Sequence, residues 1–259
     1  MRFESKKELL KYAETFINTR WKAFLNDIGL CLLPGTLENN RLYVKDLNAQ
    51  TTNPGNTEYF LSARGLLSPD EKGVYLQNAL FPSVLLCCSM LELLSGLFAG
   101  NLSTPNTSKD DKLKKTSNFS VYANKYMGYE HEISDLVILI FRHKISHMTI
   151  PSDIIILNYD IELPASQLVL KKGSRISWIV STGNFAPHLA VAEHDSSTSK
   201  IIGAPWPVTT EYSLSIDIET FINDLYNSIY GKKGFLHDLK TSYPMQAKFE
   251  QAMAHIFPA

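Results

Sequence analysis

The chain begins with a pattern of apolar residues that is typical of an amphipathic helix. From about Ser5 to Ile28, apolar residues recur three or four positions apart, which places them on one face of a helix. Ser5 followed by Glu8 forms a capping-box pattern, in which a hydroxyl and a carboxylate satisfy free backbone N–H groups of the first turn. The pattern therefore predicts a long first helix that packs one face against a core.

Two more helices are predicted before residue 150. One begins at Ser68, where SPDE supplies an N-cap, a proline at the first helical position and acids in the first turn, and it ends near Gly100. Pro82 should kink this helix or split it in two. The other helix occupies residues 118–146 and is expected to break near Gly128.

After residue 151 the pattern changes to short apolar runs separated by turn-forming residues. The runs DIIILNYDIEL, SQLVLKKGSRISWIVST, PHLAVAEH and YSLSID predict strands, and LVLKKGSRISWIV is a candidate hairpin. Asp217 is expected to cap a helix, and a last helix should cover residues 245–256. The expected fold class is α+β: an N-terminal helical bundle, then a small antiparallel sheet with C-terminal helices packed on it. Residues 1–150 and 151–259 are the expected domains, unless they form one continuous domain.

The composition is that of a soluble globular protein, because 44% of the 259 residues are hydrophobic and 20% are charged. Lys and Arg number 25 against 26 Asp and Glu, so a nucleic-acid site would need a local basic patch. The apolar run 79–99 is long enough to span a membrane, but Glu92 and Pro82 inside it favour a buried helix. With no secretory signal pattern and no CxxC pair among three cysteines, we expect a cytoplasmic protein without a membrane partner.

The candidate chemistry lies in FRHKISH, residues 141–147, at the end of the third predicted helix. No GxGxxG, GxxxxGK[ST], GxSxG or HExxH motif is present, so no cofactor is expected. Arg142 and His147 have the spacing R-x4-H. This motif, at the end of an apolar helix, resembles the HEPN superfamily of helical nucleases and nucleic-acid-associated domains, over roughly residues 81–151.

The resemblance implies a metal-independent endoribonuclease in which two copies of the motif, usually from two protomers, face each other across a cleft. Arg142 and His147 match the motif, and His143 occupies the polar position after the arginine. We therefore expect a homodimer that cleaves single-stranded RNA, and a monomer without activity. The sequence names no protein partner.

The residue types suit this reaction. A histidine titrates near neutral pH and can take the proton of a ribose 2′-hydroxyl, which then attacks the neighbouring phosphodiester. An arginine donates two hydrogen bonds to the phosphate, Lys144 adds attraction for it, and Glu92 or Asp135 would orient Arg142. Residues five apart on a regular α-helix point about 140° apart. The helix must therefore end between Arg142 and His147, or a second copy must complete the site.

Two other interpretations of FRHKISH stay open. Cationic residues gather in the last turn of a helix, where they face free carbonyl groups, so the Arg–His pair could be structural within an inert HEPN-like interaction or dimerisation module. His143 and His147 are four positions apart and could bind one metal ion, but no third ligand is evident, and no metal is expected. Other histidines are expected to face the solvent: His188, His194, His237 and His255.

Overall fold

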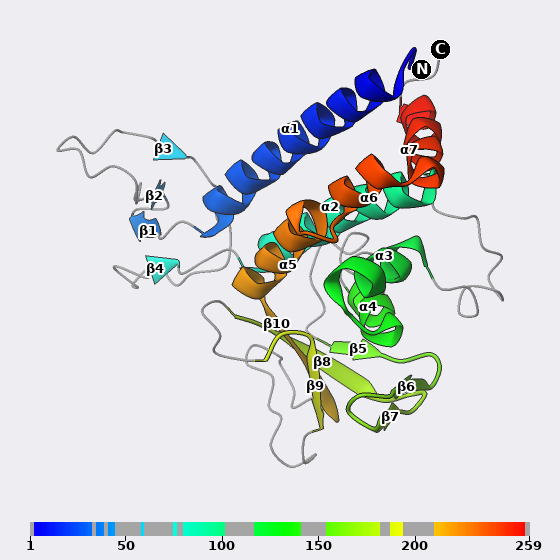
Figure 1. Ribbon diagram of the computed structural model, residues 1–259. Coiled ribbons are helices and arrows are strands. Elements are labelled where there is room, and N and C mark those ends of the chain that lie inside the picture. Colours follow the sequence, from blue (N-terminus) through cyan, green and yellow to red (C-terminus); the bar gives the residue numbers. More distant parts are fainter. Residues whose placement is uncertain are drawn as a thin grey trace.

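The described part of the chain places helices over a small sheet (Figure 1). The structure is a computed structural model, and it describes residues 3–32, 35–38, 41–44, 58–59, 75–76, 80–101, 117–140, 154–181, 187–193 and 210–256. Its helices are α1 (Lys6–Leu32), α2 (Leu80–Ala99), α3 (Asn118–Met127), α4 (His131–Val137), α5 (Ile218–Tyr230), α6 (Phe235–Thr241) and α7 (Tyr243–Ile256). Residues 138–140 continue α4 as a π-helical turn.

The strands fall into two groups along the chain. β1 (Gly35–Glu38), β2 (Arg41–Val44), β3 (Glu58–Tyr59) and β4 (Tyr75–Leu76) lie between α1 and α2 and pair in the order β3-β2-β1-β4. The second group follows α4 and comprises β5 (Ile154–Ile156), β6 (Ile161–Leu163), β7 (Leu168–Leu170), β8 (Arg175–Ser181), β9 (Ala190–Glu193) and β10 (Tyr212–Asp217). Helices and strands in separate runs confirm the α+β class.

α1 confirms the first predicted helix and extends it to Leu32. Ser5 Oγ accepts a hydrogen bond from the Glu8 N–H at 3.2 Å, and the Glu8 carboxylate accepts one from the Glu4 N–H at 2.9 Å. The Ser5 bond is the one that the capping-box pattern predicts, whereas Glu8 bonds to the N–H one residue before the cap and not to that of Ser5. The predicted apolar face is buried through Leu9, Ala13, Ile17, Phe24 and Ile28.

α2 begins at Leu80, so the prediction that this helix starts at Ser68 is wrong. Tyr75 and Leu76 form strand β4, which pairs with β1, and the helix cannot extend through a strand. Pro82 lies in the first turn of α2, where a missing N–H removes no helical hydrogen bond, so it neither kinks nor splits the helix. The SPDE signal itself lies outside the described residues.

α2 is the central helix of the core. It contacts α1, α3, α5 and α7, and Leu91, Leu94 and Leu97 are fully buried. Within the described ranges, the stretch Pro82–Ala99 alone is long and apolar enough to cross a membrane, and 56% of it is buried inside the protein. Packing against neighbouring helices therefore accounts for its apolar character, as in the core helix of a soluble protein.

Gly128 separates α3 from α4, as the sequence predicts. Its φ of 74° is the left-handed conformation in which helices commonly end, and its N–H points to the carbonyl groups of Ala123 and Asn124. Ser117 caps the start of α3, because its Oγ accepts a hydrogen bond from the Ser120 N–H at 3.1 Å. α3 packs on both α2 and α4.

The strands after α4 form a four-stranded sheet in the order β5-β8-β10-β9 and a separate β6–β7 hairpin. β8 and β10 run parallel, and the other neighbours in this sheet are antiparallel. The predicted hairpin between β7 and β8 is wrong, because β7 pairs with β6 and β8 pairs with β5 and β10. The KKGS turn instead carries the chain to the sheet, where the Gly173 N–H donates to the Leu157 carbonyl at 2.8 Å.

β10 leads directly into α5, and Asp217 caps the helix as predicted. Its Oδ1 accepts hydrogen bonds from the Thr220 N–H at 2.8 Å and from Thr220 Oγ1 at 2.7 Å. α5 packs on α2 and α3, and α7 packs on α2. Buried residues of the helices and of the sheet form one hydrophobic cluster. The short helix α6, between α5 and α7, is not among the predicted elements.

Candidate functional site

The predicted catalytic motif lies in residues 141–150, which are outside the described part of the chain. Arg142, His143, Lys144 and His147 therefore remain predictions. The structure does describe the helix that leads into the motif. The described part of that helix, α4 with its π turn, runs to residue 140.

α4 has one face in the core. Ile133, Ser134, Leu136 and Val137 are buried on it, and Ile140 at the end of the π turn is fully buried. The helix also contacts β6. In a π turn the N–H of residue i+5 bonds to the carbonyl of residue i, and such turns occur frequently at functional sites. The described residues that precede the motif thus belong to an anchored helix whose last described turn is wider than an α-turn.

The two predicted supporting carboxylates lie on different helices, α2 and α4. Glu92 is half-buried near Cys88, where burial and then the charge of Glu92 raise the pKa of the thiol. Asp135 is half-buried, and its Oδ1 accepts a hydrogen bond from Ser117 Oγ at 2.9 Å. Burial raises the pKa of Asp135, and the bond from Ser117 opposes this effect. Asp135 thus has a partner at the start of α3, and its role beside Arg142 remains a prediction.

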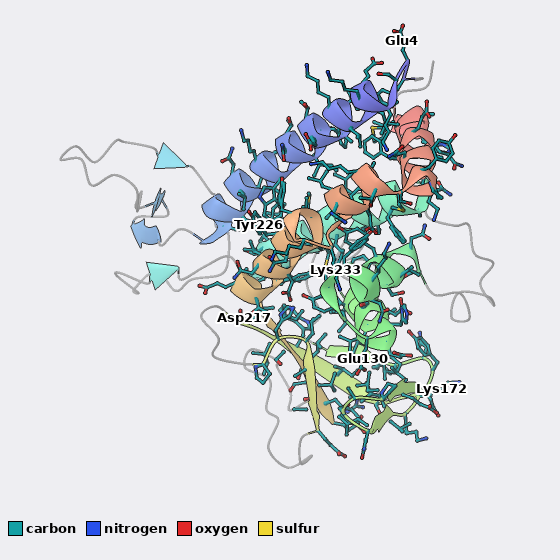
Figure 2. All side chains as sticks on the ribbon, viewed as in Figure 1. Glu4, Glu130, Lys172, Asp217, Tyr226 and Lys233 are labelled. Carbon is teal, nitrogen blue, oxygen red and sulfur yellow. The ribbon has the colours of Figure 1, made fainter. Side chains whose placement is uncertain are left out.

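Four residues from separate elements form a hydrogen-bonded chain, which we call the His188 network: Tyr129, His188, Asp217 and Asp224. The Asp217 N–H donates to His188 Nδ1 at 3.2 Å. His188 Nε2 lies 2.9 Å from the Tyr129 hydroxyl, which donates to Asp224 Oδ2 at 2.7 Å. Because Nδ1 accepts and the tyrosine proton is directed to Asp224, the histidine proton must be on Nε2. Figure 2 labels Asp217 at the junction of the sheet and α5.

The surroundings of the His188 network disfavour acid–base chemistry by its members. Burial lowers the pKa of His188, although the charges of Asp224 and Asp217 act in the opposite direction. Burial, followed by the charge of Asp224, raises the pKa of Tyr129. The tyrosine therefore stays protonated, the histidine stays neutral, and both ring nitrogens are engaged. The hydrogen bonds of the network fix the orientations of the Tyr129 and His188 side chains.

The stability of the protein should depend on pH through His188. Its folded pKa lies below the ordinary 6.5, so below pH 6.5 the unfolded chain binds the proton more readily than the folded one. We expect the free energy of unfolding to fall with decreasing pH, by up to about 1.4 kcal/mol per pH unit until the folded pKa is reached. Urea unfolding between pH 7.5 and 5 measures this effect.

His188→Gln is the matched control for the pH effect, because the amide can accept from the Asp217 N–H and donate to Tyr129 without titrating. Its unfolding free energy should depend less on pH than that of the wild type, so the two profiles converge on acidification. Parallel profiles would contradict the assignment of the effect to His188.

A pocket of about 360 Å³ adjoins the network, and we call it the Tyr129–His188 pocket. One wall is the α3–α4 junction, with Tyr129, Glu130 and Ile133. The β6–β7 turn supplies a second wall, and the start of β9, from His188 to Val191, a third. Glu130 Oε1 joins two of these walls, because it accepts a hydrogen bond from the Ala165 N–H at 3.0 Å. Figure 2 labels Glu130 where the helices meet the hairpin.

Two residues with left-handed backbone lie at the walls of the Tyr129–His188 pocket. Leu189, which lines the pocket, has a φ of 50°, and Gln167, which follows the lining residue Ser166, has a φ of 56°. This conformation is uncommon for residues other than glycine and costs of order 1–3 kcal/mol. Strain of this kind concentrates at ligand-binding and active sites. The strain at Leu189 is held next to the histidine of the network.

The expectation that His188 faces the solvent is wrong. Its side chain lies between Tyr129 and Phe221, with ring centroids 5.5 and 5.4 Å away. His237 and His255 are exposed, as predicted, and His194 lies outside the described residues.

A second hollow, of about 630 Å³, lies at the start of α1. Lys6, Lys7 and Lys11 of α1 and Lys240 of α6 line it. Glu14 also lines it and forms an ion pair with Lys240 at 2.6 Å. The hollow is at the N-terminal end of α1, well separated from α4 in Figure 1. It does not belong to the Tyr129–His188 pocket.

Metal ligands do not gather in the described ranges, where no three His, Cys, Asp or Glu side chains come together as a metal ion would need. His143 and His147 lie outside these ranges.

The Tyr129–His188 pocket is not predicted by any pattern in the sequence. Tyr129 and Asp224 are 95 positions apart, and Tyr129 and His188 are 59 apart. No local spacing links residues so distant, since only the fold brings their elements together. The one local signal was the glycine before Tyr129, which marks a helix end and not a binding site.

Comparison with known proteins gives no further guide to function. No family model matches the chain, and neither a curated protein nor a solved structure matches it. The case for a function therefore rests on the motif and on the geometry of the described residues.

Proposed function

We propose that this protein is a metal-independent endoribonuclease that cleaves single-stranded RNA and acts as a homodimer in the cytoplasm. The observation that carries the proposal is the R-x4-H motif, Arg142 to His147, placed directly after a core-anchored helix. In the proposed reaction His147 takes the proton from a ribose 2′-hydroxyl, and the oxygen attacks the adjacent phosphorus. Arg142 stabilises the charge that builds on the phosphate oxygens. The bond to the 5′-oxygen of the next nucleotide breaks, and this oxygen takes a proton from water, so the products end in a 2′,3′-cyclic phosphate and a 5′-hydroxyl.

The spacing of the motif favours a site that a second protomer completes. Arg142 and His147 are five positions apart, and on a regular α-helix their side chains would point about 140° away from each other. A copy of the motif from the second protomer would supply the missing partner for each side chain.

The basic hollow at the start of α1 supports RNA as the substrate class. Lysine ammonium groups attract phosphates without regard to sequence. The chain as a whole has a net charge of −1, so this local concentration of lysines matters more than the total. Its distance from α4 indicates a role in holding the RNA chain and not in cleavage.

The proposal is tested with an end-labelled single-stranded RNA of mixed sequence in the presence of EDTA. We expect cleavage products that end in a 2′,3′-cyclic phosphate. An RNA with a single 2′-deoxynucleotide at a mapped cleavage position should resist cutting there, because the attacking hydroxyl is missing. Arg142→Ala protein, purified in parallel, controls for contaminating ribonuclease.

Two results would overturn the proposal. One is cleavage that stops with EDTA or continues at the deoxynucleotide, because either rules out this mechanism. The other is the absence of cleavage across several RNAs while Arg142→Ala lowers the free energy of unfolding. That second result favours the inert interaction module, in which the arginine is structural.

A further inference from the structure

We infer that the Tyr129–His188 pocket binds a guanine base of the RNA, with Glu130 as the group that recognises it. This inference rests on the proposed function, because it names the part of the substrate that the protein reads. The described residues that line the pocket lie at the start of α4, in the β6–β7 turn and at the start of β9, and none of them belongs to the motif.

The lining of the pocket fits a flat, uncharged ligand. Ile133, Leu189 and Val191 supply apolar surface, and the rings of Tyr129 and His188 supply aromatic surface. The polar atoms of both rings are already used within the His188 network, and the rings also pack against each other and against Phe221, so they present apolar ring surface to the pocket. Stacking of a base on an aromatic side chain is the common way in which proteins hold unpaired nucleotides.

The charges around the pocket exclude a phosphate as the main ligand there. Among the described residues that line it, none is lysine or arginine, and the one charged residue is the acid Glu130. An anion would be repelled by this carboxylate, whereas a neutral group with N–H donors would be attracted. The lysine-lined hollow, by contrast, has the charge that a phosphate needs.

Glu130 selects guanine among the four bases. Its Oε1 is fixed by the Ala165 N–H at 3.0 Å, and within the described part of the chain its Oε2 accepts no hydrogen bond. A carboxylate held in this way can accept two parallel hydrogen bonds from adjacent donors. The Watson–Crick edge of guanine presents two adjacent donors, N1–H and the N2 amino group. Adenine, cytosine and uracil do not present such a pair.

Binding of nucleoside 5′-monophosphates to the full chain tests the inference, with isothermal titration calorimetry as the readout. Guanosine, inosine and adenosine monophosphates share the same phosphate, so differences report on the base. Inosine monophosphate keeps N1–H but lacks the N2 amino group. We expect guanosine monophosphate to bind at least tenfold more tightly than either of the others.

Glu130→Gln tests the named residue. The amide oxygen can still accept from the Ala165 N–H, but the amide nitrogen donates and cannot face the guanine donors. We expect affinity for guanosine monophosphate to fall by about 10- to 100-fold, the range for one bidentate contact to a base. Glu132→Gln is the matched control, because it removes the next acid on α4 without touching the pocket lining. Its affinity should stay within about twofold of the wild type.

Equal affinity for the three nucleotides, no binding of any of them, or binding that Glu130→Gln leaves unchanged would each overturn the inference. The titration needs no cleavage, so it separates this inference from the proposed function. Selective guanine binding without ribonuclease activity would support the assignment of the pocket and contradict the proposed ribonuclease function. RNA cleavage without selective binding of guanosine monophosphate would support the ribonuclease function and contradict the assignment of the pocket.

Discussion

His147→Ala is expected to slow RNA cleavage by about 100- to 10,000-fold in protein that remains folded and dimeric. This is the usual contribution of a side chain that transfers a proton in the rate-limiting step. Rates of single-turnover cleavage of a labelled RNA measure the effect, and circular dichroism with size-exclusion chromatography checks the fold and the dimer. His143→Ala tests the other histidine of the motif, and His255→Ala, at an exposed position of α7, is the control that should keep the wild-type rate. A loss in His143→Ala as large as that in His147→Ala would show that the assignment of the proton-transfer role is wrong.

Arg142 provides the second arm of the same experiment. Arg142→Ala should lower the rate by a factor of about 100 to 1,000, as the loss of one donor to a developing oxyanion does. Arg142→Lys retains the charge but loses the planar pair of donors, so it should recover only part of the rate. Full recovery by lysine would mean that charge alone matters and that the bidentate contact is not made.

Phe221→Ala is expected to lower the free energy of unfolding by about 3–5 kcal/mol, the range for removing a phenyl ring from a core. Phe221 is 1% exposed on α5, and its ring lies 5.4 Å from that of His188 and 6.3 Å from that of Tyr129. Its loss would leave a cavity directly beneath the His188 network. Urea unfolding at pH 7 measures the change.

Asn223→Ala is the matched control for Phe221→Ala, because Asn223 is exposed on the same helix. Its free energy of unfolding should remain within about 0.5 kcal/mol of the wild type. A loss below about 1 kcal/mol in Phe221→Ala would contradict the packing of this ring in the core. A large loss in both variants would point to the helix as a whole and not to the buried ring.

The sequence predicts those parts of the fold that depend on neighbouring residues. The cap at Ser5, the helix break at Gly128 and the cap at Asp217 are local hydrogen-bond or backbone effects, and each is found where it is predicted. Periodic apolar residues likewise locate α1 and α5, because one face of each helix is buried against α2.

The errors concern contacts between distant segments. The pattern identifies β7 and β8 as strands, but pairing depends on which partner the fold presents, and both strands pair elsewhere. The predicted start of α2 at Ser68 is wrong for a related reason. Pairing with β1 holds Tyr75 and Leu76 in an extended conformation, so the helix begins only after them. The Tyr129–His188 pocket is the extreme case, since its walls come from three separate parts of the chain.

The four members of the His188 network also define a signature by which related chains can be recognised. A tyrosine followed by glutamate directly after a helix-ending glycine comes first, and a histidine follows the tyrosine after 59 positions. A helix-capping aspartate comes 29 positions after that histidine, and a second aspartate stands one to two helical turns beyond the cap. A chain that keeps the tyrosine, the histidine and the two aspartates with similar spacing, in the same order of helix, strand and helix, could form the same hydrogen-bonded network even where little else in its sequence agrees. Related proteins can thus be sought by the spacing of these few residues, since comparison of the whole sequence finds no match.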